Sequence, residues 1–176
     1  FTFEKYIKNK IKDKNQNENT IILRHDVDRK PNQAIKLAKI AFENDVQATF
    51  NFRVLRDRTD SNAVIEIAKM GHEIGYHYED LSIAKGDINL SIQFFEKNLS
   101  LLREIADVKT ATMHGRPLSK FDNREIWNFT SVDKFNLTGE AYKSIDYKNL
   151  YYITDTGRTW GLDLSIERCA RIVDDG

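Results

Sequence analysis

The chain contains a single cysteine, Cys169, among its 176 residues. One cysteine excludes an internal disulfide framework and a metal cage built from thiolates. Lys and Arg together number 27, as do Asp and Glu, so the chain lacks the excess of basic residues that attracts nucleic acids and anionic membranes. We find no apolar run long enough to cross a bilayer and no secretory signal. These absences predict a cytoplasmic protein with no nucleic-acid partner and no membrane span; they give no indication of oligomeric state.

The length and composition fit one globular domain over residues 1–176. Hydrophobic residues make up 40% of the chain and charged residues 31%, which is typical of a domain with a sizeable core. The first residue is Phe1 rather than Met, so we expect the chain to be part of a longer polypeptide.

Short apolar runs alternate with amphipathic segments along the chain. Helical periodicity predicts helices near 3–11, 31–42, 62–70, 87–105, 123–129 and 162–172. Apolar runs predict strands at 21–23, running into the polar residues 24–28, and at 46–54, 72–77, 110–114, 135–138 and 150–154. Alternating strands and helices indicate an α/β fold with a mostly parallel sheet or barrel and helices outside.

Polar side chains gather where the predicted strands end. His25, His77 and His114 lie at or near the ends of the first, third and fourth strands, beside acidic residues. In parallel α/β folds these strand ends line one face, where active sites form. His72 begins its strand and is expected to be structural. The sequence therefore predicts a site that combines carboxylates and imidazoles.

Asp26 and Asp28 are two residues apart, so both point to the same side of an extended chain. Two carboxylates this close repel each other unless a cation or a shared proton intervenes. One could bind a metal while the other removes a proton from water. The alternative is that Asp28 caps the helix opened by Pro31 and that Asp26 pairs with Arg24 or Arg29.

His77 and Glu79 share a strand face, and both are ordinary ligands of zinc and similar ions. The alternative for His77 is a structural hydrogen bond to a backbone carbonyl. His114 could bind metal, orient the base or donate a proton, or it could simply pack in a turn. Arg116 could hold Asp26, bind a substrate anion or lie in solvent.

Two residues that follow the predicted strand at 150–154 complete the candidate set. Trp160 could stack on a sugar ring and Asp155 could orient a catalytic group, although tryptophan is more often a core residue. The sequence predicts a core that includes Phe50, Phe52, Ile92 and Phe95.

The chain resembles the polysaccharide deacetylase superfamily (carbohydrate esterase family four) from about residue 21 to residue 160. Leu23-Arg24-His25-Asp26-Val27-Asp28 is similar to its first motif, usually Thr-Phe-Asp-Asp-Gly, where the first Asp is the general base and the second binds metal. The resemblance implies that Asp26 is the base and Asp28 a ligand. Met113-His114-Gly115-Arg116-Pro117 falls where the family has an Arg-Pro motif that orients the base, and 155–160 where it has an Asp-Trp motif.

The second motif departs from the family pattern. Residues 71–77 resemble the stretch that leads into His-Ser/Thr-x-x-His, whose two histidines bind metal. His77 matches the first histidine, but Leu81 occupies the second position. Glu79, His114 and His25 are candidates to replace it; otherwise the metal is weak or absent. The family's final Leu-x-His motif, whose His is the general acid, has no match, and His114 could substitute.

The resemblance implies a distorted (β/α) barrel with fewer than eight complete units. It also implies a hydrolase that uses a divalent metal, with zinc expected, to remove an acyl group from an amino sugar of a bacterial surface polysaccharide or its precursor. The alternatives are a degenerate carbohydrate-binding barrel and a metal-free amidohydrolase. A backbone N–H near Asn51 or Tyr78 would stabilise the oxyanion. The expected roles are catalysis by Asp26, His114, Arg116 and Asp155, metal binding by Asp28, His77 and Glu79, and substrate contacts from Trp160, Tyr78 and Asn51.

Overall fold

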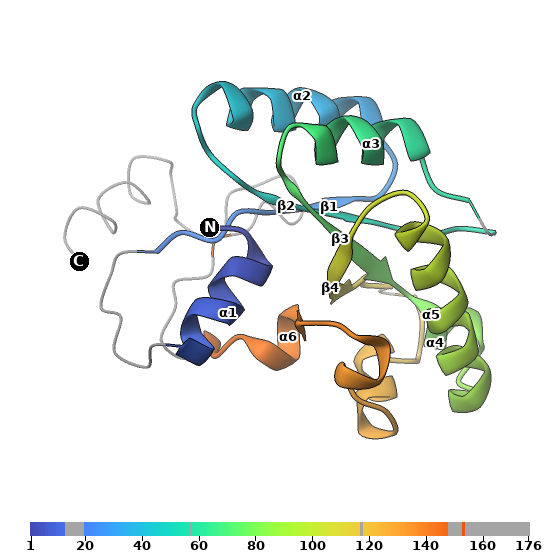
Figure 1. Cartoon of the computed structure of the whole chain (residues 1–176). Coiled ribbons are helices and arrows are strands. Elements are labelled where there is room, and N and C mark those ends of the chain that lie inside the picture. The colour runs from blue at the N-terminus through green and yellow to red at the C-terminus, as the bar shows by residue number, and fades with distance from the viewer. Residues whose placement is uncertain (13–19, 57, 117, 148–152, 154–176) are drawn as a thin grey trace.

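The fold is an α/β arrangement around one parallel sheet (Figure 1). The computed structural model describes residues 1–12, 20–56, 58–116, 118–147 and 153. The sheet has the order β1-β2-β3-β4-β5, and every neighbouring pair is parallel. Its strands are β1 Arg24–Val27, β2 Thr49–Phe52, β3 Glu73–Tyr78, β4 Val108–Met113 and β5 Gly139–Glu140. The predicted parallel α/β fold is confirmed, whereas closure into a barrel stays a prediction.

Helices connect the strands. The α-helices are α1 Phe3–Lys12, α2 Pro31–Glu43, α3 Ser61–Lys69, α4 Asp80–Ile83, α5 Ile88–Arg103 and α6 Ala141–Ser144, and the 3-10 helices are η1 Asn123–Asn128 and η2 Asp133–Phe135. Local sequence sets several of their ends. The side chain of Asp60 accepts a hydrogen bond from the Ala63 amide at 2.9 Å, and Asp87 caps α5 in the same way. Gly71, with φ of +82°, follows α3 in the left-handed conformation that glycine tolerates best.

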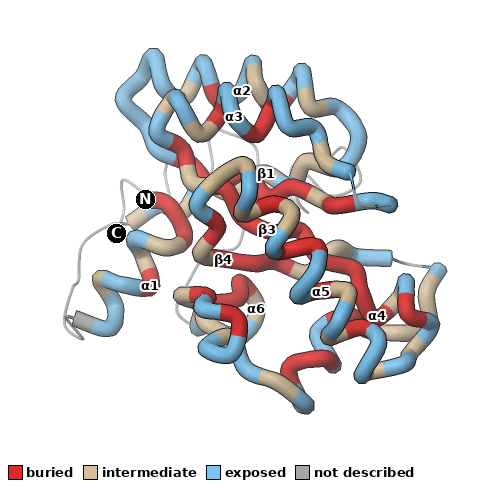
Figure 2. The backbone as a smooth tube through the Cα atoms, turned by 45° about the vertical axis from the view of Figure 1, so that its right-hand side comes forward, coloured by how far each residue is buried: buried red, intermediate tan, exposed pale blue. Residues whose placement is uncertain are grey.

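One face of the sheet is apolar and carries the core. Phe50, Phe52, Tyr76 and Tyr78 pack there against residues of α2, α3 and α5. The Tyr76 ring contacts Phe95 of α5 edge-on, with ring centroids 5.1 Å apart. Figure 2 shows the buried residues along the strands and on the inner sides of α2 and α3. The core prediction is confirmed for Phe50, Phe52 and Phe95.

The opposite face of the sheet is polar, and α1 covers its amino-terminal end. The backbone N–H of Phe3 donates to Thr49 Oγ1 at 2.8 Å, and that of Glu4 donates to Glu73 Oε2 at 2.8 Å. Glu73 also accepts a hydrogen bond from the Thr110 hydroxyl. Side chains alternate between the two faces of a strand, so residues two apart along β1, β2 and β3 continue this polar face toward the carboxyl ends. The candidate site therefore lies on the polar face.

Some predicted elements differ from the structure. The apolar run at 21–23 precedes β1 rather than forming a buried strand, and Ile21 and Leu23 are exposed. The strand predicted at 135–138 is wrong: Phe135 ends η2, and Leu137 reaches the core from a loop. The strand predicted at 150–154 and the helix at 162–172 lie outside the described residues, apart from residue 153, which is in neither a helix nor a strand. Within the described residues, no helix has the length and apolar character needed to cross a bilayer.

Candidate metal centre

Three strand ends bring Asp28, His77 and His114 together. Asp28 directly follows β1, His77 lies near the end of β3, and His114 directly follows β4. One potential ligand atom from each lies within 4.8 Å of the others. The His114 Nδ1 atom is 3.1 Å from His77 Nε2 and 3.1 Å from Asp28 Oδ1, and His77 Nε2 is 3.5 Å from Asp28 Oδ1. One carboxylate and two imidazoles suit zinc and related divalent ions, so these residues fit the expected cofactor.

His77 is oriented as a metal ligand would be. Its Nδ1 lies 3.1 Å from the carbonyl oxygen of Thr112, and only a protonated nitrogen can donate to that carbonyl. The lone pair of the neutral ring is therefore on Nε2, which faces Asp28 and His114. Burial lowers the pKa of His77, and Asp26 and Asp28 only partly oppose this effect. Both factors favour the neutral imidazole that binds metal ions. The hydrogen bond to the Thr112 carbonyl therefore does more than hold His77 in place, because it turns the unprotonated Nε2 atom toward Asp28 and His114.

Asp28 is available to the cluster because it does not cap α2. The residue before that helix is Lys30, which makes no side-chain capping bond, so the capping alternative is wrong. Burial acts to raise the pKa of Asp28, but the hydrogen bond and charge of His114, helped by His77, outweigh it and lower that pKa. Asp28 is thus ionised at neutral pH and half exposed at the mouth of the site.

Asp26 lies beside the cluster and is held by two neighbours. The Asn51 amide donates to Asp26 Oδ1 at 2.9 Å, and Arg24 Nη2 is 3.3 Å from Asp26 Oδ2. The other oxygen contact, from His77 Nε2 to Asp26 Oδ2, is longer at 3.9 Å. The pairing of Asp26 with Arg24 is confirmed. The side chain of Asn51, which was expected to contact substrate, is buried and contacts the Asp26 carboxylate. Asp26 is therefore fixed in orientation yet about one quarter exposed.

Glu79 and Arg116 pair with each other, which differs from the sequence prediction. Glu79 accepts hydrogen bonds from Arg53, and its Oε2 is 3.3 Å from Arg116 Nη1. The Glu79 carboxylate, which was expected to bind metal, is thus paired with two guanidinium groups. His114 takes its place among the candidate ligands. Arg116 was expected to hold Asp26, but Arg24 does so.

The remaining predicted residues have different surroundings. The side chain of Tyr78 is fully buried and donates its hydroxyl to Glu140, so it contacts the core rather than the site. Leu81 is also in the core and cannot contribute a ligand. His72 is structural as expected: the Ala48 amide donates to its Nδ1, and its Nε2 contacts the Ala38 carbonyl. Asp155 and Trp160 lie outside the described residues.

Two contributors to the site, Arg53 and Gly75, were missed from the sequence, and a third, Arg24, was only partly foreseen. Arg53 follows β2 and binds Glu79, and Arg24 was seen only as an alternative partner for Asp26. Gly75 provides the space for Asn51, because a Cβ atom there would lie 2.0 Å from Asn51 Oδ1. The spacing of two residues between Arg24 and Asp26, and between Asn51 and Arg53, was the available signal, since it places each pair on one face.

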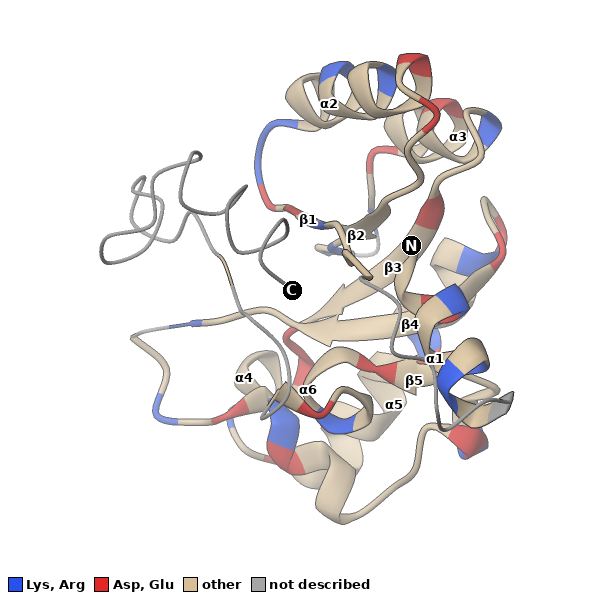
Figure 3. Ribbon diagram, turned by 90° about the vertical axis from the view of Figure 1, so that its left-hand side faces the viewer, with Lys and Arg blue, Asp and Glu red and all other residues tan. Residues whose placement is uncertain are grey.

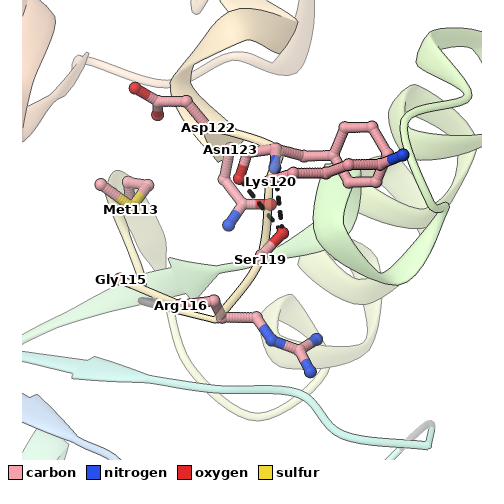
Figure 4. A pocket seen from close by; sticks show the side chains of 8 residues that line it. Met113, Gly115, Arg116, Ser119, Lys120, Asp122 and Asn123 are labelled. Atoms are coloured by element: carbon pink, nitrogen blue, oxygen red, sulfur yellow. Dashed lines mark hydrogen bonds between the residues drawn. The ribbon is translucent and has the colours of Figure 1, made fainter.

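A cavity of about 370 Å³ adjoins the cluster on the loop after β4. It is lined by Met113, Gly115, Arg116, Ser119, Lys120, Phe121, Asp122 and Asn123. Figure 4 shows these side chains around the loop, with Arg116 extending away from Met113 and Asp122. The Asn123 amide donates to the carbonyl of His114 at 3.3 Å and so ties the cavity wall to the cluster.

Comparison with known proteins gives one structural match that bears on this arrangement. No protein-family model matches the sequence, and no curated protein does. The fold resembles the crystal structure of a mutant of a CE4 family pseudoenzyme with restored enzymatic activity, with a TM-score of 0.52 and 17% identity. The match covers 72% of this chain and 46% of that one, so the chain spans about half the length of the structure it resembles. The chain thus shares its fold with a CE4 family protein over the residues that the match covers.

Proposed function

We propose that this chain is a metal-dependent hydrolase that removes an acyl group from an amino sugar of a surface polysaccharide or its precursor. The observation that supports this most strongly is the convergence of Asp28, His77 and His114 beside a separately held carboxylate, Asp26. A site that only binds sugar needs no such pair of acids next to two imidazoles. The shared fold with a CE4 family protein agrees with this proposal.

Asp28, His77 and His114 would hold the divalent cation. Zinc suits two imidazoles and one carboxylate and leaves a coordination position open. The cation would supply Lewis acidity to the acyl carbonyl. The Thr112 carbonyl fixes the His77 ring, and the lowered pKa of Asp28 keeps that ligand ionised.

Asp26 would be the general base. It lies next to the ligand cluster without belonging to it, and its partial exposure leaves room for water to reach it. Asn51 and Arg24 hold both of its oxygens, so the carboxylate is already oriented before substrate binds. In this arrangement His114 is a ligand rather than the proton donor, and Arg24 has the orienting role.

The second candidate function is a carbohydrate-binding barrel without turnover. Leu81 favours it, because this buried side chain occupies the position of a metal-binding histidine in the resembling family. The loss of that histidine is compensated by His114, which brings a second imidazole to the cluster from the end of another strand. Metal content and turnover separate the two functions.

The experiment is elemental analysis of the purified protein together with turnover of an N-acetylated amino sugar. We expect about one equivalent of a divalent ion, retained in Asp26→Asn and lost in Asp28→Ala and His77→Ala. The control is His72→Ala, which removes a histidine at the opposite end of β3 and should keep the metal. Asp26→Asn should lower turnover by about two to four orders of magnitude if Asp26 is the base. Metal retained in His77→Ala, or full turnover in Asp26→Asn, would reject the proposal.

A further inference from the structure

Two arginines share one buried carboxylate at the edge of the candidate metal centre. Arg53 donates Nε–H and Nη2–H to Glu79 Oε1, and Arg116 Nη1 lies 3.3 Å from Glu79 Oε2. The Glu79 side chain is only 4% exposed. Because one carboxylate balances only one of the two guanidinium groups, the trio keeps a net positive charge. The need to neutralise Glu79 therefore does not account for both arginines.

Arg116 has hydrogen-bonding capacity that the described part of the chain does not use. Over the described residues its guanidinium makes the ion pair with Glu79 but no hydrogen bond, and Glu79 Oε2 likewise has no hydrogen-bond donor. A guanidinium carries five N–H donors in a planar fork that matches carboxylate and phosphate oxygens. The Arg116 side chain is 46% exposed, so a ligand can reach these donors.

The position of the arginines relates them to the chemistry. Glu79 comes two residues after His77, and Arg116 two residues after His114. Two residues of extended chain span about 7 Å, so the backbones of Glu79 and Arg116 lie within about that distance of the backbones of His77 and His114. This separation is comparable to the width of one sugar ring. A substrate with its acyl group at the cluster would thus reach the arginines with a substituent on the same or the next ring.

The cavity beside the cluster has the same positive character. Arg116 and Lys120 both line it (Figure 4). Its one acidic residue, Asp122, is neutralised by Arg124, which donates Nε–H at 3.0 Å to each carboxylate oxygen. Among the described residues no carboxylate pairs with Lys120, whose ammonium group instead lies 5.2 Å from the centre of the Phe121 ring. Figure 3 shows basic positions along the loop that follows β4.

We propose that Arg116, supported by Arg53 and Lys120, binds an anionic group of the substrate, so that the natural substrate is an amino sugar carrying a phosphate or a carboxylate. This inference rests on the proposed function for the position of the acyl group. Arg116 is the group that contacts the anion, and Arg53 positions it by holding Glu79. Sugar phosphates and uronic acids both carry negatively charged oxygens that could bind Arg116, and the test distinguishes these two kinds of substrate.

The test is calorimetric binding of three ligands to the metal-loaded protein: N-acetylglucosamine, its 1-phosphate and the corresponding N-acetylated uronate. We expect the 1-phosphate, the uronate or both to bind more tightly than the neutral sugar. Arg116→Gln should weaken the tighter binding by about 10- to 100-fold, which corresponds to one or two charge-assisted hydrogen bonds, and should leave the neutral sugar unchanged. Arg116→Lys keeps the charge without the fork and should recover only part of the loss.

The matched control is Lys36→Gln, which removes one positive charge from an exposed position on α2. Thermal unfolding of each variant shows whether it is folded. Equal binding of all three ligands, or anion binding that Arg116→Gln leaves intact, overturns this inference even if the protein binds metal and hydrolyses the neutral sugar. Anion binding that depends on Arg116 in a protein without turnover would support the inference and reject the hydrolase.

Discussion

Replacing Gly75 with alanine should disturb Asp26 without touching it. An added Cβ at Gly75 would lie 2.0 Å from Asn51 Oδ1, whereas ordinary contacts begin near 3.4 Å. Asn51 is buried, so it cannot move by the required ~1.4 Å without strain or loss of its hydrogen bond to Asp26. Overpacking a core typically costs about 1–3 kcal/mol, and a hydrogen bond to a charged group is worth about 1.5–3 kcal/mol. We therefore expect Gly75→Ala to lower the free energy of unfolding by about 1–3 kcal/mol through overpacking alone, and by up to about 6 kcal/mol when the hydrogen bond to Asp26 is also lost.

Urea denaturation measures this loss, and Gly115→Ala is its control because a Cβ there would meet nothing within 4 Å. The double variant Gly75→Ala with Asn51→Ser removes the clashing amide. If the contact with Asn51 causes the loss, the two changes together should cost less than the sum of the single changes. Equal stability of Gly75→Ala and Gly115→Ala, or strictly additive effects in the double variant, would refute the reasoning.

Three further predictions concern side chains around the sheet. Arg24→Ala should lower kcat by about tenfold or more and leave the metal content unchanged, because it frees one oxygen of Asp26. An unchanged kcat in Arg24→Ala, or an Arg24→Lys variant that recovers none of the lost kcat, would exclude an orienting role. His72→Ala should lower the free energy of unfolding by about 2–4 kcal/mol, since it removes two buried hydrogen bonds, and urea denaturation measures this. Burial raises the pKa of Glu140 to about 7, above its ordinary value of 4.5, so the folded state holds this proton more tightly than the unfolded state. Glu140 should therefore make the protein less stable as pH rises from about 4.5 to 7, by up to about 3 kcal/mol, and Glu140→Gln should flatten that part of a stability profile measured in urea.

Helices and inner strands could be predicted because their patterns are strong. The apolar spacing after Pro31 and the stop at Gly71 give α2 and α3 close to their observed bounds. The failures occurred where tertiary contacts decide. β5 has only two residues, and their strand geometry comes from pairing with β4 rather than from any local pattern. The apolar run at 21–23 looks buried in the sequence, but β1 is the edge strand of the described sheet and leaves it exposed.

The site was predictable in composition but not in pairing. Spacing along single strands correctly placed Asp26 with Asp28 and His77 with Glu79 on shared faces. Which charge meets which carboxylate depends on the neighbouring strands, and a single sequence does not contain their register. Arg53 and Arg116 arrive at Glu79 from β2 and from the loop after β4, so Glu79 becomes an ion-pair partner and His114 joins the ligand group.

The three candidate ligands come from three separate segments rather than from one short helical or loop motif. An ion bound by Asp28, His77 and His114 would act as a cross-link between the ends of β1, β3 and β4. Its affinity would then depend on the whole sheet, since no single loop could retain the ion after the strands separate. Global unfolding should consequently release the metal, and the melting temperature should rise with the free metal concentration.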